Sequence, residues 1–159
     1  MGKPRMGQAF SIIELVIVLV IIGVIAAIAV PRLTRGATNA SATALAADLA
    51  ALRNAVELYR AEHEGSFPTV ANFVNQLTQF SDTPGTGFGA VADVGNGIVY
   101  GPYLKAIPPL PVGSNKGATG VAHNANPATA WYYTETTGEI TANVKGTLVD
   151  KDGKAYNAY

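Results

Sequence analysis

Cysteine is absent from this 159-residue chain, and histidine occurs only twice, as His63 and His123. The sequence therefore excludes disulfides and thiol chemistry, and it lacks the paired Cys and His spacing of a transition-metal site. The formal net charge is zero, without the clustered basic residues that nucleic acid binding needs. No Gly-x-Ser-x-Gly motif occurs, and no partner is placed by sequence to activate Ser66 or Ser114. We predict that the protein is not an enzyme, and we expect His63 to lie at a solvated helix end.

The sequence does contain one long apolar run, Phe10–Val30, which reads FSIIELVIVLVIIGVIAAIAV. About 20 helical residues at 1.5 Å each cross the roughly 30 Å hydrocarbon core of a bilayer, so this run is long enough to span a membrane. Glu14 is ionisable and lies near one end, which costs a few kcal/mol in lipid unless the carboxylate is paired or reaches the interface. Pro31 follows the run and marks either its end or a kink.

Two interpretations of the run come from general patterns. One is a cleaved secretory signal, for which Lys3 and Arg5 supply a basic lead-in, although the apolar run is longer than the usual signal core and no clean Ala-x-Ala site with a polar mature start follows it directly. The other is a plain N-terminal membrane anchor, in which Glu14 sits at the favourable N-terminal end of the helix dipole.

A third interpretation comes from a resemblance. A short basic leader, then Phe10, Glu14 four residues on, an apolar helix and a proline together resemble the N-terminus of type IV pilins and type II secretion pseudopilins. The resemblance implies that a prepilin peptidase removes residues 1–9 by cutting between Ala9 and Phe10, and that Phe10 is then N-methylated. The family usually has glycine just before the cut, whereas this chain has Ala9 there and Gly7 two residues earlier. A cut after Gly7 would make Glu14 the seventh mature residue instead of the fifth.

The resemblance also assigns filament assembly to Glu14 and Pro31. Processing creates a cationic amine on Phe10, at the same depth in the membrane as the Glu14 carboxylate. An unpaired charge there is costly, and pairing between neighbouring subunits offsets part of that cost. Such pairing would set the axial stagger of helices in a filament. Pairing within one chain, or snorkelling of Glu14 to the interface, is the alternative.

Charges on the two sides of the run leave its orientation open. Arg32 and Arg35 follow the run, whereas Lys3 and Arg5 precede it, so the positive-inside rule does not decide between them. The resemblance implies that the leader lies in the cytoplasm and the globular domain outside.

A helical pattern resumes at Ser41. Apolar residues recur at steps of four and three along one face, at Leu45, Leu49, Leu52, Val56 and Tyr59. Gly65 is placed to cap the end of this helix. We predict one long helix from Phe10 to about Glu64, loosened near Pro31 and Gly36. A coiled coil is the weaker interpretation, because the stripe has fewer than three heptads. The predicted division is a leader (1–9), a membrane or filament-core helix (10–31) and a globular domain (32–159).

The C-terminal half carries shorter signals. Thr69 is placed to N-cap a short helix that presents Val70, Phe73, Val74, Leu77 and Phe80 on one side. Strands are predicted at 131–134 and 139–144, and further strands at 147–149 and 154–159. The predicted fold is α+β, a pilin fold in which an antiparallel sheet closes over the apolar stripe.

Two further segments, Leu52–Thr69 and Gly101–Pro111, resemble the major pseudopilins. Where that family favours Asp-Pro-Trp-Gly-Asn, this chain reads Leu-Pro-Val-Gly-Ser-Asn at 110–115. The absence of a C-terminal disulfide loop, which many type IV pilins carry, favours a pseudopilin. The resemblance also suggests calcium in a C-terminal loop, with Asp150 and Asp152 as ligands. An ordinary turn at Asp-Lys-Asp-Gly is the alternative.

The predicted function is that of a structural subunit of a type II secretion pseudopilus, which polymerises through its N-terminal helix to drive protein export. The implied partners are other copies of the chain, the prepilin peptidase, the inner-membrane assembly platform, minor pseudopilins and membrane lipid. The implied location is the inner membrane, with a single span. A type IV pilin for adhesion or motility, and a membrane-anchored binding module that never polymerises, are the alternatives.

Overall fold

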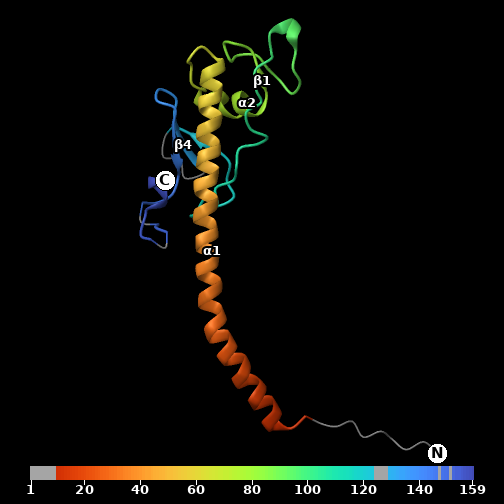
Figure 1. Cartoon of the computed structure of the whole chain (residues 1–159), viewed down its shortest axis with the longest axis vertical. Coiled ribbons are helices and arrows are strands. Elements are labelled where there is room, and N and C mark those ends of the chain that lie inside the picture. Colours follow the sequence, from red (N-terminus) through yellow and green to blue (C-terminus); the bar gives the residue numbers. More distant parts are fainter. Residues whose placement is uncertain (1–9, 124–128, 147, 151) are drawn as a thin grey trace, which may run out of the picture. The chain divides into compact units, whose positions relative to one another are not determined.

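The computed structural model describes residues 10–123, 129–146, 148–150 and 152–159. The chain divides into two units, Met1–Ala37 and Thr38–Tyr159, which are described separately below. One long helix contributes to both units, and the strands all lie in the second (Figure 1). The predictions for residues 1–9, including the leader and Ala9, lie outside the described residues.

The long helix α1 runs from Ile12 to Glu62 and has 51 residues. The helix continues through residues 31 and 36 without a break, so Pro31 does not end it. The prediction of one long helix from the apolar run to the end of the amphipathic stripe is therefore confirmed, with ends two residues inside the expected ones.

The C-terminal end of α1 has a Schellman-type geometry. The Gly65 N–H donates to the Arg60 carbonyl over 2.9 Å, and both Glu64 and Gly65 have positive φ, at 55° and 85°. Gly65 therefore terminates the helix as predicted. The left-handed C′ position itself belongs to Glu64, a side chain that adopts this conformation less readily than glycine.

The core of the second unit forms on one face of α1. All five residues of the predicted apolar stripe are buried, and Leu45 and Leu52 are fully inaccessible. They pack in one hydrophobic cluster with side chains from α2, the sheet and the proline-rich segment, chiefly Phe73, Leu77, Leu110, Trp131, Tyr133 and Ile140.

The region after α1 folds into short elements. A 3-10 turn η1 (Val70–Asn72) leads into α2 (Phe73–Thr78), where a single short helix was expected. Thr69 does precede the turn, but its side chain caps nothing. Its N–H and hydroxyl instead donate to Gln76 Oε1, over 2.8 and 3.3 Å. The buried Gln76 thus fixes Thr69 through two donated hydrogen bonds, and the predicted N-cap bond does not form.

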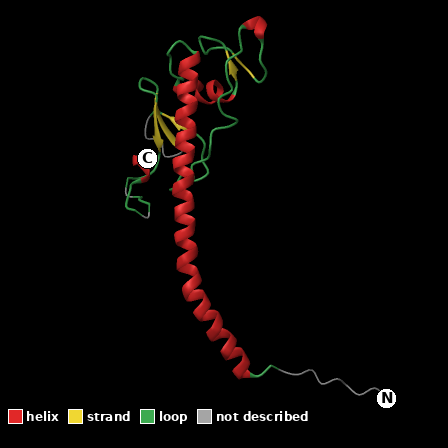
Figure 2. Cartoon of the chain, viewed as in Figure 1, coloured by secondary structure: helices red, strands yellow, loops and turns green. Residues whose placement is uncertain are grey.

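Two small sheets follow (Figure 2). Strand β1 (Phe80–Ser81) pairs antiparallel with β2 (Phe88–Gly89), and a 3-10 turn η2 (Val94–Asn96) lies beyond them. In the second sheet, β4 (Trp131–Thr134) pairs antiparallel with β5 (Glu139–Ala142), with Trp131 opposite Ala142. The predicted hairpin is confirmed.

The outer parts of this sheet differ from the prediction. Strand β3 (Val121–Ala122) runs parallel to β4, so the sheet is mixed and not wholly antiparallel. A strand of two residues shows no alternation of apolar and polar residues, so the sequence gives no signal for it. Contacts with residues about ten positions away hold it beside β4: the N–H groups of Ala130 and Trp131 both donate to the Gly120 carbonyl. At the C-terminus, Val149 and Ala155 make only an isolated antiparallel bridge, and Tyr156–Ala158 is a 3-10 turn, η3.

His63 is buried, with 1% of its surface exposed, so the expectation of a solvated helix end was wrong. Its ring stacks on Tyr59 with centroids 3.7 Å apart. Nδ1 lies 2.8 Å from the Tyr59 carbonyl, which only accepts, so Nδ1 is the donor there, and Nε2 is hydrogen-bonded to the Ser81 hydroxyl over 2.9 Å. The histidine therefore joins the end of α1 to β1.

We expect Leu52→Ala to lower the free energy of unfolding by about 2–5 kcal/mol, because Leu52 is fully buried and its truncation leaves a cavity. Leu58→Ala is the matched control on the same helix, since Leu58 is 55% exposed, and about 0.5 kcal/mol or less is expected there. Urea unfolding of the detergent-solubilised chain, followed by the emission of Trp131, measures both, because Trp131 is the single tryptophan and is fully buried. Equal midpoints for the two variants would contradict the assigned core.

Candidate functional site

The N-terminal end of α1 holds Glu14, which the sequence assigned to both processing and assembly. Ser11 precedes the first helical residue, Ile12, and occupies the N-cap position. Glu14 is then the third residue of the helix, and its Oε2 accepts the Ser11 backbone N–H over 2.9 Å. Ser11 Oγ in turn accepts the Ile13 N–H over 3.4 Å. This is a capping-box arrangement, which satisfies N–H groups that the helix itself leaves unbonded.

Glu14 therefore has a structural role that the sequence argument missed. The signal was present, because Ser11 and Glu14 stand three residues apart, as the Ser-x-x-Glu capping box requires. The carboxylate also sits in the first turn, where the helix dipole favours negative charge. This contact is to a backbone amide and not to the Phe10 amine, so the pairing of Glu14 with an amine stays a prediction.

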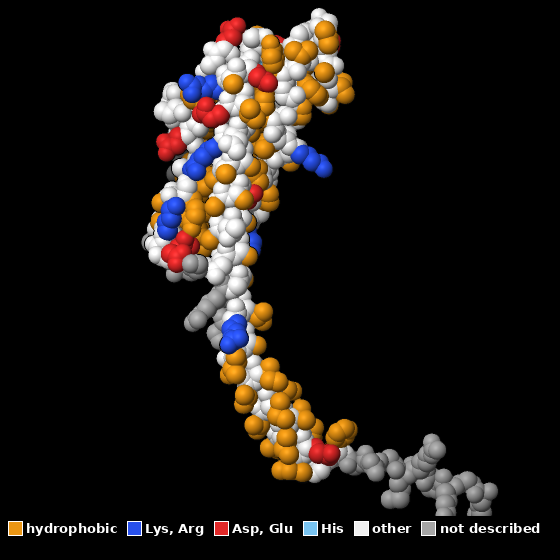
Figure 3. Space-filling model, viewed as in Figure 1, with side chains coloured by type: hydrophobic (Ala, Val, Ile, Leu, Met, Phe, Trp, Pro, Cys, Tyr) orange, Lys and Arg blue, Asp and Glu red, His pale blue; other side chains and the backbone are white. Residues whose placement is uncertain are grey.

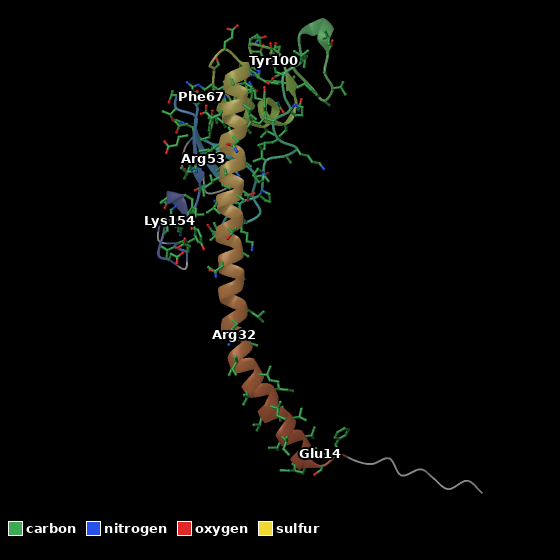
Figure 4. The ribbon with its side chains drawn as sticks, in the orientation of Figure 1. Glu14, Arg32, Arg53, Phe67, Tyr100 and Lys154 are labelled. Carbon is green, nitrogen blue, oxygen red and sulfur yellow. The ribbon has the colours of Figure 1, made fainter. Side chains whose placement is uncertain are left out.

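The surface around this site is apolar. Among the described residues, the segment Ile12–Val30 is the one helical stretch long and apolar enough to cross a bilayer, and none of it is buried by the rest of the chain. Phe10 is 81% exposed and Leu19 68% exposed. Figure 3 shows hydrophobic side chains covering this stretch, with the carboxylate of Glu14 at its end, where Figure 4 labels it. Such a surface needs lipid or other protein to cover it.

The other predicted residues of the N-terminal site are only partly placed. Phe10 lies just before the N-cap, within four residues of Glu14. Position 31 lies within α1, nineteen residues after its start at Ile12. Ala9 lies outside the described residues, so the structure leaves the cleavage position a prediction.

The two calcium candidates line one cavity of about 260 Å³, formed with Tyr159 and a stretch of α1 that contributes Asn39, Ala42, Thr43 and Ala46. Asp150 has several partners there. Its Oδ1 accepts the N–H groups of Asp152 and Lys154 over 2.8 and 2.9 Å, and its Oδ2 accepts the Tyr159 hydroxyl. That hydrogen bond to the carboxylate, with partial desolvation, raises the pKa of Tyr159 to about 12.

This geometry is that of a turn closed by an aspartate side chain. Among the described residues, no three His, Cys, Asp or Glu side chains come together as a metal-binding group. Two carboxylates with carbonyl oxygens and water could still supply the oxygen ligands that calcium takes, so binding at Asp150 and Asp152 stays a prediction.

Comparison with known proteins points to the same class as the N-terminal pattern. Two curated proteins that match are both named type II secretion system core protein G. The one from Escherichia coli (strain K12) is 30% identical over 77 residues, which are 48% of this chain and 52% of that protein. The one from Vibrio cholerae serotype O1 (strain ATCC 39315 / El Tor Inaba N16961) is 26% identical over 115 residues, 72% of each chain. The resemblance to the type II secretion pseudopilins is confirmed.

The extent of that resemblance is limited. The chain spans about half the length of the Escherichia coli protein that it matches. No family model matches the chain, and no solved structure matches it. The pseudopilin likeness therefore rests on the two sequence matches together with the α+β arrangement and the apolar N-terminal helix.

We expect Asp150→Ala to lower the melting temperature in the presence of a chelator, because the substitution removes the acceptor of three hydrogen bonds. A hydrogen bond to a charged group contributes about 1.5–3 kcal/mol to the free energy of unfolding. If Asp150 and Asp152 also hold calcium, adding calcium should raise the melting temperature of the wild type and leave the Asp150→Ala, Asp152→Ala double variant unchanged. Thermal unfolding with calcium and with chelator separates the two effects. If calcium does not change the melting temperature of the wild type, the segment is an ordinary turn and not a calcium site.

Proposed function

We propose that this chain is a structural subunit of a type II secretion pseudopilus and not an enzyme. The observation that carries the proposal is the helical stretch Ile12–Val30, none of which is buried by the rest of the chain, at the N-terminal end of a chain similar to core protein G. A surface of this length and composition is covered by lipid while the subunit waits in the membrane. In a filament the same surface is covered by the helices of neighbouring copies.

Assembly on this proposal begins with processing. A prepilin peptidase cuts between Ala9 and Phe10 and leaves the apolar helix in the mature protein with a new amine on Phe10. The globular domain faces the outer side of the inner membrane. An assembly platform and minor pseudopilins then bring subunits together, and growth of the filament drives export.

Glu14 supplies the charge for this step. A neighbour's Phe10 amine entering the apolar interior of a filament would be costly without a counter-ion. The Glu14 carboxylate is already oriented by the Ser11 N–H, which takes up one of about four lone-pair sites on its two oxygens. Sites therefore remain for an ammonium group from another copy, and the capping box need not open.

The capping box also favours a second candidate. Because Glu14 helps to cap the N-terminal end of its own helix, its presence in an apolar segment does not by itself require a neighbouring copy. A membrane-anchored module that never polymerises would need the same cap. Experiments on Glu14 must therefore separate its capping role from its charge.

We expect the mature protein to begin at Phe10, without residues 1–9, because only this cut makes Glu14 the fifth residue. Intact-mass analysis of protein extracted from membranes measures the N-terminus and its methylation together. A mature chain that begins beyond Pro31 would identify a cleaved secretory signal and contradict the proposal. A cut after Gly7 would leave the pseudopilin class in place but remove the Phe10 amine from the pairing.

We expect Glu14→Ala to abolish most filament formation while the globular core, built from Leu45 onward, stays folded. Glu14→Gln is the decisive variant, because glutamine can still accept the Ser11 N–H but carries no charge. If charge pairing drives assembly, Glu14→Gln should fail nearly as completely as Glu14→Ala, since losing one member of a buried pair costs about 3–5 kcal/mol.

The measurement compares sheared filaments with membrane-retained subunits for both Glu14 variants. Ser11→Ala is the matched control, because it removes the serine hydroxyl from the cap and leaves every charge in place. Normal filament yield from Glu14→Gln, with loss in Glu14→Ala, would show that capping alone matters. Normal yield from both variants would favour the anchored module.

A further inference from the structure

Arg32 is an exposed cation at the end of the apolar segment (Figure 4). No ion pair to it occurs within the part of the chain that the structure describes. The sequence offers no nearby counter-ion either, because no acidic residue occurs between Glu14 and Asp48. Within the described residues Arg32 is therefore an exposed cation with no ion pair, and its guanidinium is available to an anion from outside the chain.

The spacing along α1 places this guanidinium at a defined depth. Arg32 follows Glu14 by eighteen residues of continuous helix, which corresponds to about 27 Å. The hydrocarbon core of a bilayer is roughly 30 Å thick, and no charged residue lies between the two. When Glu14 lies near one boundary of the hydrocarbon core, Arg32 lies near the other, at the level of the lipid headgroups.

Arg35 is three positions further along the same helix, and residues three apart lie on neighbouring positions of one helix face. The sequence thus gives two arginines within one turn of the helix, and a guanidinium suits a phosphate because its planar fork of donors matches phosphate oxygens. Anionic lipids attract basic residues that lie next to a span, and this attraction differs from the positive-inside preference because it concerns the lipid itself.

We propose that Arg32 and Arg35 bind the phosphate of an anionic phospholipid in the leaflet at the C-terminal end of the span. The inference rests only on the membrane-anchoring part of the proposed function. It also means that a subunit must give up these phosphate contacts when it leaves the bilayer for a filament.

The test is native mass spectrometry of the full-length protein in a non-ionic detergent. The protein is titrated with phosphatidylglycerol or with phosphatidylcholine of the same acyl chains. We expect the wild type to prefer phosphatidylglycerol, and we expect Arg32→Gln, Arg35→Gln to weaken that preference roughly 25-fold, about fivefold for each arginine. Arg60→Gln is the matched control, because Arg60 is a cation of the same helix that is already paired with Glu57.

Three outcomes would overturn the inference. The double variant could keep the full preference for phosphatidylglycerol, Arg60→Gln could lose as much of it as the double variant does, or inorganic phosphate could displace the lipid at equal concentration. The last result would identify free phosphate as the ligand. The substitution of both arginines by lysine should retain part of the preference, because charge remains while the planar fork is lost.

Flotation with neutral phosphatidylcholine vesicles tests the anchor separately. We expect wild type and double variant to float equally, because the apolar segment is unchanged. Failure of both to float would contradict the membrane anchoring itself. Equal flotation with no loss of lipid preference in the double variant would contradict only the assignment of Arg32 and Arg35.

Discussion

The apolar surface of residues 12–30 is the constraint on which the rest of this protein depends. None of this segment is buried by the chain, and each Å² of apolar surface left in water costs about 25 cal/mol. The protein therefore cannot exist in water as an isolated copy of this structure without a large exposed apolar surface. Lipid or other copies must cover it. The charged residues at its two ends, Glu14 and Arg32, are about as far apart as the hydrocarbon core of a bilayer is thick.

The same helix meets different surroundings in the second unit, because its residue pattern changes. Beyond Thr38 the large apolar side chains are confined mainly to one face, where Leu45, Leu49, Leu52, Val56 and Tyr59 are buried. Alanines and polar or charged residues occupy most of the remaining positions, so this part of α1 needs only one covered face. The short strands and loops that follow cover that face with Trp131, Tyr133 and Ile140. The chain thus covers the apolar stripe in the C-terminal part of α1 and leaves the apolar segment 12–30 uncovered.

Local periodicity predicted the parts of this fold that depend on near neighbours. The long helix, the buried stripe and the hairpin at Trp131–Ala142 follow from residues within a few positions of one another. His63 was misplaced because its burial depends on Ser81, eighteen residues away, and on stacking against Tyr59. The parallel pairing of β3 was missed because two residues carry no pattern. In the candidate site, the capping bond from Ser11 to Glu14 depends on residues three positions apart, so the Ser-x-x-Glu spacing is enough to predict it.

The capping bond changes how an acidic residue in an apolar segment can be understood. A carboxylate that served only a neighbouring copy would be without a partner whenever the subunit waits in the membrane. Glu14 instead accepts the Ser11 N–H and lies in the first turn, where the helix dipole favours its charge. This reduces the cost of the isolated state without neutralising the charge, because an amide N–H carries no net charge. On the proposed assembly, an incoming Phe10 amine then meets a carboxylate already held in place, so assembly adds one ionic contact and does not have to reorder the helix end.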